Sequence, residues 1–233
     1  MDIFENIDCV VGLTTWKERI NNPDLPRVLF SIFSQETKYK YKVVLTLSEL
    51  EFPNKEKDIP EILLDFVKQG HMGILWVKDN LRAFKKIYPL ITMVNVPVLT
   101  TDDDIILHKN AVETFMDEHQ KHPDCILTEL GHTLAAKDEV CTGTFRLFPV
   151  NSLYPLSPDY FVKCFKGYED DVYLALLAKL RGTKTIILKR NIAHELNNIN
   201  YNKTRMRDIY TRIPWVSCRR QFIDMLRKDK IIK

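Results

Sequence analysis

The chain has 233 residues, of which 45% are hydrophobic and 28% are charged, so it has the composition of a globular protein and not of a disordered one. Its 7 glycines are too few for a fibrous or low-complexity protein. No apolar run reaches the roughly 18–20 residues that span a bilayer. A chain of this length can bury a sizeable core, as one large domain or two small ones.

The cysteines and the amino-terminal residues favour a cytoplasmic protein. The 5 cysteines are at least 16 residues apart, which excludes a CxxC metal or redox motif and favours reduced thiols. Residues 1–6 are acidic and lack the basic start and apolar stretch of a signal peptide. We therefore expect the protein in the cytoplasm.

The net charge of +3 is unevenly distributed. Residues 200–233 carry ten Lys or Arg and three Asp or Glu, a balance of +7, which leaves −4 on the rest of the chain. A basic segment on a mildly acidic body suggests contact with phosphates, an anionic lipid surface or an acidic acceptor. A solvated terminal helix is the alternative.

Short apolar strands alternate with amphipathic helices along the chain. Strands are predicted at 9–15, 41–47, 74–77, 96–100, 125–128 and 184–188. Helices are predicted at 25–33, from Pro60 to 66, from Arg82 onward, at 112–119, and at 172–180 before Gly182. Prolines break up residues 129–160, which we expect to be less regular. This alternation requires crossovers, so it predicts one α/β domain with a mainly parallel sheet covered by helices on both faces.

Three consecutive aspartates, Asp102, Asp103 and Asp104, follow the strand at 96–100 directly. Ligands of open α/β sheets bind beyond the carboxyl ends of the strands. Adjacent carboxylates repel one another, and Lys109 alone cannot neutralise three of them. Mg²⁺ and Mn²⁺ prefer carboxylate oxygens and leave positions open to phosphate, so the segment predicts a metal site. An acidic loop or helix start is the alternative.

A second acidic cluster, Glu169, Asp170 and Asp171, lies at the start of a predicted helix. Asp171 is 67 residues after Asp104. Helix capping explains part of this pattern, but three acids exceed what capping uses. Two separate carboxylate clusters suit a site in which one holds metal and the other supplies a general base.

Two weaker candidates follow later strands. His194 lies just past the last strand, and neutral imidazole binds divalent metals, although a lone histidine is more often structural. Asp79 and Asn80 end the strand at 74–77 and could bind a base or ribose, while the cations after them, including Lys85, could reach phosphate. A turn followed by a solvated helix face is the alternative.

Taken together, these motifs resemble the GT-A fold glycosyltransferases, particularly the small bacterial family 2-like enzymes. The resemblance covers about residues 8–195. The segments that carry it, by their order and spacing, are 10–19, Asp79-Asn80, 101–104, 169–171 and His194.

The resemblance implies a single GT-A, Rossmann-like domain over 1–199, followed by a basic C-terminal helical extension over 200–233. It also implies a nucleoside-diphosphate-sugar donor, with UDP-sugars favoured. Thr14 and Thr15 would lie under the base or ribose, and Asp79 at the base edge. The full set expected to bind the donor is Thr14, Thr15, Arg19, Asp79, Asn80, Lys85, Asp102 and Asp103.

The resemblance also assigns roles to the acidic motifs. Asp102 and Asp104 resemble the family's Asp-x-Asp motif: Asp102 would face the ribose or the metal, Asp104 would coordinate the Mn²⁺ or Mg²⁺ that bridges the diphosphate, and His194 would help to bind the metal. Many relatives have their functional aspartate eleven residues before a glycine, and counting back from Gly182 gives Asp171 as the base. Asp170 is the second choice.

One feature departs from the family pattern. Relatives often have a glycine-rich loop on the acceptor side before the second acidic motif, whereas residues 141–146 keep only Gly143. The loop is therefore expected to be placed differently here.

The resemblance implies a metal-dependent, inverting glycosyltransferase of hexosyltransferase type. It would use a glycan or lipid-linked acceptor in surface polysaccharide or glycoconjugate synthesis, with peripheral membrane contact through 200–233. A pyrophosphorylase or phosphohydrolase is a rival, but residues 15–19 lack the glycines of a phosphate loop. A non-catalytic binding protein of the same fold is a second rival, against which the intact acidic motifs argue. Nucleic acid is not an expected partner, since basic residues cluster only in the tail.

Overall fold

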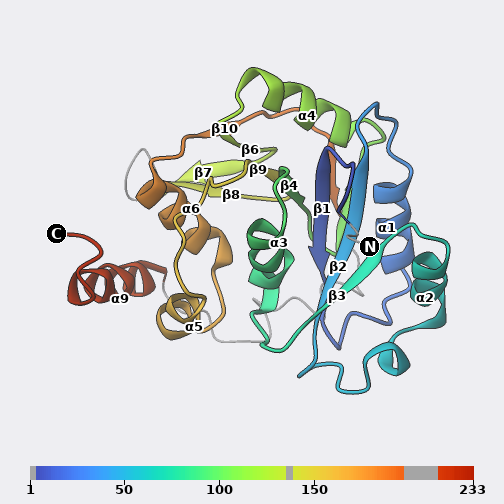
Figure 1. The fold of residues 1–233 in the computed structure, drawn as a ribbon, viewed down its shortest axis with the longest axis horizontal. Helices are drawn as coiled ribbons and strands as arrows, with labels where there is room; N and C mark the ends of the chain where they lie inside the picture. Colours follow the sequence, from blue (N-terminus) through green and yellow to red (C-terminus); the bar gives the residue numbers. More distant parts are fainter. Residues whose placement is uncertain (1–3, 135–138, 197–214) are drawn as a thin grey trace.

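The computed structural model describes residues 4–134, 139–196 and 215–233. Its centre is a seven-stranded sheet in the order β10-β6-β9-β4-β1-β2-β3 (Figure 1). The strands are β1 (Cys9–Thr14), β2 (Tyr41–Ser48), β3 (Gly73–Val77), β4 (Val98–Thr100), β6 (Ile126–Thr128), β9 (Arg146–Phe148) and β10 (Thr185–Ile187). All the neighbouring pairs are parallel except those of β9, which runs antiparallel to β4 and β6. The predicted α/β fold with a mainly parallel sheet is confirmed.

Two small antiparallel sheets were not predicted. One pairs β5 (Ile105–Leu107) with β11 (Ala193–Glu195), and the other pairs β7 (Gly131–Thr133) with β8 (Val140–Thr142). Residues 129–160, which were expected to be less regular, contain three short strands, β7, β8 and β9. Each of these strands has three residues, which is too short to show an alternating pattern in the sequence.

The predicted helices are present. They are α1 (Leu25–Phe33), α2 (Glu61–Lys68), α4 (Ala111–Lys121) and α6 (Asp170–Arg181). The segment after Arg82 is a 3₁₀ turn, η2 (Arg82–Lys86), followed by α3 (Tyr88–Met93). The structure adds the 3₁₀ turn η1 (Lys55–Asp58) and the helix α5 (Asp159–Phe165), and it has a helix, α9 (Trp215–Lys228), within the range expected to be a helical extension. Helix α6 ends at Gly182 in the left-handed conformation, as its sequence predicted.

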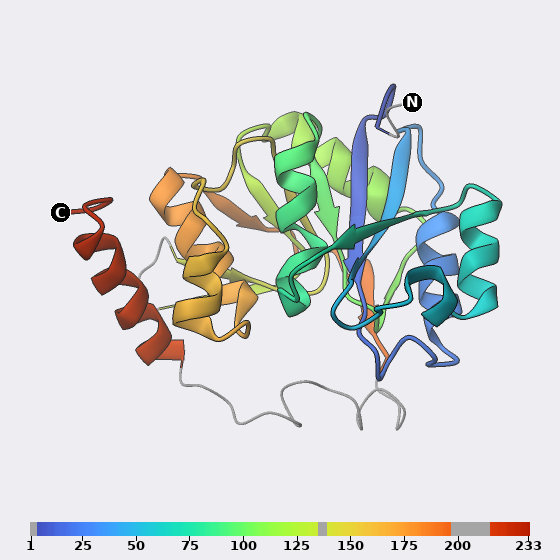
Figure 2. The ribbon, with the colours of Figure 1, turned by 60° about the horizontal axis from the view of Figure 1, so that its bottom comes forward.

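Strand β1 is buried on both faces of the sheet. Val11 and Leu13 point into the core that includes α1 and α4, whereas Val10 packs with Leu90 and Val94 on the side of α3. Alternate residues of a strand face opposite sides, so an unbroken apolar run is what a sheet covered on both faces requires. Helices lie on both sides of these strands in Figure 2.

Gly12 allows η2 and α3 to pack directly against β1. A methyl group added at Gly12 would clash with the carbonyl oxygen of Lys86 and would lie 2.6 Å from Cδ1 of Leu90. Because η2 also carries Lys85 and Lys86, this close approach sets where two buried lysines enter the carboxyl edge of the sheet.

We therefore expect Gly12→Ala to lower the free energy of unfolding by about 1–3 kcal/mol, through overpacking of the contact with η2. Urea unfolding would measure this loss. Gly73→Ala on β3 is the matched control, because no atom lies within 4 Å of the added methyl group. Equal stability of the two variants would contradict the account of Gly12.

The described part of the C-terminal segment packs onto the domain. Cys218, Phe222 and Leu226 of α9 are buried with residues of α5 and α6. Glu139, whose side chain is fully buried, accepts hydrogen bonds from Arg219 of α9 at 2.5 Å and from Lys179 of α6 at 2.9 Å. The domain boundary at 199/200 stays a prediction, and residues 200–214 lie outside the described residues.

Two further observations concern the cysteines and the helices. All five cysteines are free thiols, as their spacing predicted. Within the described ranges, no helix combines the length and the apolar character that crossing a membrane requires.

Candidate active site

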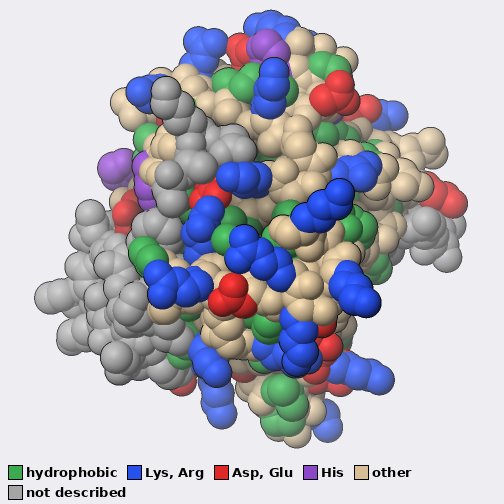
Figure 3. All heavy atoms as spheres, turned by 90° about the vertical axis from the view of Figure 1, so that its left-hand side faces the viewer, with side chains coloured by type: hydrophobic (Ala, Val, Ile, Leu, Met, Phe, Trp, Pro, Cys, Tyr) green, Lys and Arg blue, Asp and Glu red, His purple; other side chains and the backbone are tan. Residues whose placement is uncertain are grey.

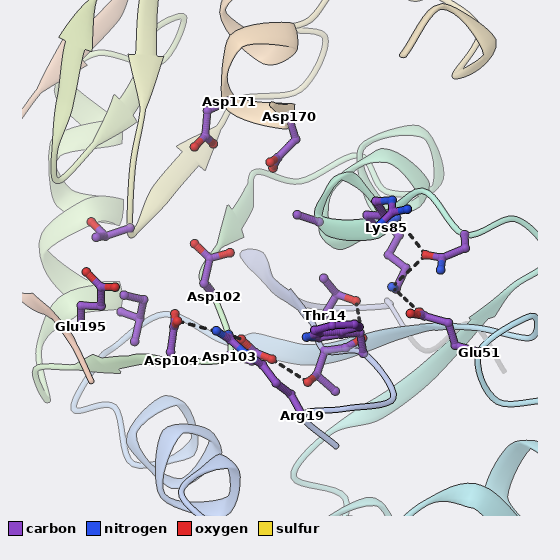
Figure 4. A pocket seen from close by; sticks show the side chains of 17 residues that line it. Thr14, Arg19, Glu51, Lys85, Asp102, Asp103, Asp104, Asp170, Asp171 and Glu195 are labelled. Atoms are coloured by element: carbon purple, nitrogen blue, oxygen red, sulfur yellow. Dashed lines mark hydrogen bonds and ion pairs between the residues drawn. The ribbon is translucent and has the colours of Figure 1, made fainter. Parts of the chain in front are cut away.

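A cavity of about 550 Å³ lies where β1 and β4 end and α6 begins (Figure 4). Parallel strands end at the same edge of a sheet, so the polar residues that follow them come together. The lining residues are Thr14, Thr15, Trp16, Arg19, Glu51, Asn80, Arg82, Ala83, Lys85, Asp102, Asp103, Asp104, Ile105, Thr144, Asp170, Asp171 and Glu195.

The cavity contains all but two of the side chains predicted to form a site. The exceptions are Asp79, which is exposed in the turn after β3, and His194, which is exposed on β11. Successive residues of a strand face opposite ways, and here Glu195 faces the cavity. The two acidic clusters, at 102–104 and at 170–171, line the same cavity.

Asp103 connects the end of β4 to the segment after β1. Its Oδ2 accepts a hydrogen bond from Thr15 Oγ1 at 2.6 Å, and its Oδ1 accepts one from Arg19 at 2.5 Å. Burial raises the pKa of the Asp103 carboxyl, although Arg19 and Thr15 oppose the shift. Thr14 donates its hydroxyl to the carbonyl oxygen of Thr46 at 2.7 Å. These bonds join the ends of β1, β2 and β4 into one wall of the cavity.

Lys85 joins the segments that follow β2 and β3. Its ammonium group lies 2.8 Å from Glu51 Oε2 and 3.4 Å from Asn80 Oδ1. The Lys85 side chain is 1% exposed, and burial lowers its pKa while Glu51 opposes the shift. Asn80 also accepts a hydrogen bond from the amide of Arg82, which fixes the turn into η2.

Two buried cations lie between the acidic clusters. Lys86 contacts Asp102 at 2.5 Å and Asp170 at 3.5 Å. Arg146 donates to Asp171 and lies 3.8 Å from Asp102. Burial raises the pKa of Asp102, but Lys86 and Arg146 outweigh it, so the pKa lies below its ordinary value. Asp102 is therefore ionised between two cations.

Asp171 and Asp104 are less completely neutralised. Burial raises the pKa of Asp171 to about 6, with Arg146 and Lys86 opposing the shift and Asp170 adding to it. Burial likewise raises the pKa of Asp104 to about 6, and Asp103, Asp102 and Glu195 add to that shift. Both carboxyls face the cavity, in whose lining acidic side chains outnumber basic ones.

The donor set of the cavity fits a divalent cation held jointly with a substrate. Among the residues that the structure describes, no three His, Cys, Asp or Glu side chains stand ready as metal ligands. Mg²⁺, however, is usually held by one or two carboxylates together with substrate phosphates and waters. Asp104 and Glu195 lie on the same side of the cavity, near Asp102 (Figure 4). These carboxylates could bind such an ion together with the phosphates of a substrate, whereas His194 is exposed and does not line the cavity.

Some residues of this region were given no role from the sequence: Trp16, Glu51, Thr144 and Glu195, which line the cavity, and Arg146, which contacts two of its aspartates. Glu51 and Glu195 could have been found, since each follows or ends a strand, as the predicted residues do. Arg146 gave no such signal, because it lies in β9, inside the range expected to be irregular.

The fold is that of known glycosyltransferases. A solved structure of S. aureus TarS in complex with UDP has a TM-score of 0.55 at 10% identity, over 80% of this chain and 59% of that chain. The mannosyltransferase PcManGT from Pyrobaculum calidifontis, in complex with GDP-Man and Mn²⁺, has a TM-score of 0.55 at 14% identity, over 89% of this chain and 62% of that chain. This chain therefore spans about three fifths of either structure.

No family model and no curated protein matches the sequence. At such low identity, the likeness to solved structures establishes the α/β fold and leaves the chemistry to the residues of the cavity.

Proposed function

We propose that the protein is a metal-dependent glycosyltransferase of hexosyltransferase type, which moves a sugar from a nucleoside-diphosphate sugar to an acceptor hydroxyl. The observation that supports this most is that Asp102–Asp104 and Asp170–Asp171 line one cavity at the carboxyl edge of the sheet. The donor-bound neighbours, TarS with UDP-GlcNAc and PcManGT with GDP-Man, support the choice of donor class. A role in surface polysaccharide or glycoconjugate synthesis is part of the proposal.

In this proposal the nucleoside lies toward Thr14, Thr15 and Asn80, and the diphosphate lies toward Asp102 and Asp104. A divalent ion held by Asp102, Asp104 and Glu195 would offset the negative charge that grows on the leaving diphosphate.

Asp171 is the proposed general base. As the acceptor oxygen attacks the anomeric carbon, Asp171 accepts the hydroxyl proton, and the bond from the anomeric carbon to the diphosphate oxygen breaks. The nucleoside diphosphate leaves, and a single displacement inverts the anomeric configuration. General-base catalysis of this kind contributes typically 10²–10⁴-fold to the rate.

The donor can be identified by thermal-shift screening of UDP-, GDP-, CMP- and dTDP-sugars with Mn²⁺, since ligand binding raises apparent stability by mass action. Turnover of the selected donor should release a nucleoside diphosphate. Release of nucleoside triphosphate on addition of pyrophosphate would instead indicate a pyrophosphorylase. Metal-dependent binding of donors without any turnover would indicate a binding protein.

The proposed base also predicts the pH dependence. Because the pKa of Asp171 is raised to about 6, its carboxyl is ionised above that pH and protonated below it. A base must be ionised, so we expect kcat at saturating donor to fall about tenfold per pH unit once the pH is well below 6. A pH–rate profile between pH 4.5 and 8 measures this. If kcat did not fall toward low pH while the protein stayed folded at pH 4.5, the assignment of Asp171 as the base would be contradicted.

A basic face supports the proposed peripheral membrane contact. Lys and Arg side chains are spread over the side of the molecule on which α9 lies (Figure 3). The exposed cations of α9 and α5 include Arg220, Arg227, Lys228, Lys163 and Lys166. Each cation near an anionic membrane surface contributes about 1 kcal/mol of attraction. Such a surface would bring the cavity to a lipid-linked acceptor.

We expect the full chain to float with phosphatidylglycerol vesicles and not with phosphatidylcholine vesicles, and to be released by salt. The triple variant R220E/R227E/K228E should lose this flotation. Flotation that is equal on both vesicles, or unchanged in the variant, would contradict membrane contact through this face.

A further inference from the structure

Arg146 occupies an unusual place for an arginine. It lies on β9, between β4 and β6, where it is paired in register with Thr100 and Thr128. Its side chain is 1% exposed. Burying a guanidinium is costly unless anions and hydrogen bonds compensate for the lost water. The groups that Arg146 contacts therefore indicate its role.

Those partners are the two acidic clusters of the cavity. Arg146 Nη1 donates to Asp171 Oδ1 and to Thr142 Oγ1, the latter at 3.4 Å, and Nη2 lies 3.8 Å from Asp102 Oδ2. Burial lowers the pKa of Arg146, but Asp171, Asp102 and Asp170 outweigh it, so the guanidinium is charged. One rigid planar group thus connects the end of β4 to the start of α6.

The contact with Arg146 orients Asp171. Oδ1 of Asp171 is engaged by the guanidinium, while the side chain remains 39% exposed and faces the cavity. Lys86 contacts the neighbouring Asp170 rather than Asp171 at ion-pair distance. A base is effective when a third group fixes its direction, and Arg146 is the group that does so here.

We infer that Arg146 is the positioning residue for Asp171: it holds the carboxylate so that its second oxygen points at the acceptor hydroxyl. This inference rests on the proposed function, in which Asp171 is the base. Arg146 is too deeply buried to bind the donor itself, and Asp102 keeps its closer contact with Lys86 at 2.5 Å, so the loss of Arg146 should reduce turnover more than donor affinity.

The test uses the slow hydrolysis of GDP-mannose or UDP-GlcNAc, whichever stabilises the protein with Mn²⁺, with water as the acceptor. We expect Arg146→Met to lower kcat at least tenfold while KM for the donor changes less than threefold. Arg146→Lys should recover part of the rate, because it restores the charge without the fork of two donors. Arg219→Met is the matched control, since it removes another arginine–carboxylate pair away from the cavity.

A double-mutant cycle separates positioning from a merely structural role. If Arg146 acts through Asp171, Arg146→Met should cause no further loss of kcat in the Asp171→Asn background. The same fold-loss in both backgrounds, or no loss in either, would overturn the inference. If Arg146→Met does not fold, Arg146→Lys takes its place in the cycle with the same outcomes. Near-normal turnover by Asp171→Asn alone would instead overturn the proposed function.

Discussion

Asp171→Asn should lower kcat for sugar transfer by about 10²–10⁴-fold, because it removes the group that accepts the acceptor proton. The amide has nearly the same shape, and the side chain is partly open to the cavity, so the fold should persist. Donor binding should also persist, since Asp171 lies apart from Thr14 and Lys85 in the cavity (Figure 4). Release of nucleoside diphosphate measures kcat, and the donor-induced thermal shift measures binding.

Two control variants sharpen this prediction. Asp159→Asn removes an exposed carboxylate at the start of α5, outside the cavity, and should leave kcat unchanged. Asp170→Asn tests the second choice for the base, and we expect a smaller loss than for Asp171→Asn. A larger loss of kcat for Asp170→Asn than for Asp171→Asn would indicate that Asp170 is the base. Near-normal transfer by both variants would contradict general-base catalysis from this cluster.

Asp104→Asn should abolish metal-dependent donor binding. Arg19 contacts Asp104 at 3.2 Å, while burial and the neighbouring carboxylates Asp103 and Asp102 raise the pKa of Asp104 to about 6, and a bound cation would favour its ionised form. With the wild-type protein, donor at a hundred times its Kd with Mn²⁺ should add about 2.7 kcal/mol of stability. In the variant this gain should fall to near zero, and transfer should fall with it.

Chelation provides the matched measurement for Asp104. Adding EDTA to the wild-type protein should reproduce the loss of donor-induced stability seen in the variant, and adding it to the variant should change nothing more. Glu36→Gln, a change at an exposed carboxylate away from the cavity, serves as the control variant. Full donor binding in EDTA would show that Arg19, Lys85 and their neighbours hold the diphosphate without metal.

Local patterns predicted the longer elements of the fold. The strands β1, β2 and β3 are recognisable as apolar runs, and the helices α1, α4 and α6 as apolar residues at helical spacing. Of the three-residue strands, β4, β6 and β10 were predicted from their apolar runs, whereas β5, β7, β8, β9 and β11 were not, because each of these is stabilised by pairing with another segment. β9, for example, is inserted between β4 and β6, which no local pattern specifies.

The same distinction applies to the site. Acids that follow a strand could be predicted, since parallel strands share an edge. The sequence could not predict which of two adjacent residues faces the cavity, because that depends on pairing with a distant strand. Thus Glu195 rather than His194 faces inward from β11, whose partner β5 lies far away in the sequence. The role of Arg146 could not be predicted either, because it depends on the pairing of β9 with β4 and β6 and on the contact with Asp171.

The most direct test is a crystal structure of the protein with UDP or GDP and Mn²⁺, in which the anomalous signal locates the manganese. We expect the manganese peak between Asp104 and the diphosphate, with Asp171 facing the position that the sugar would occupy. A nucleotide bound outside this cavity, or a manganese peak remote from Asp104, would contradict the account.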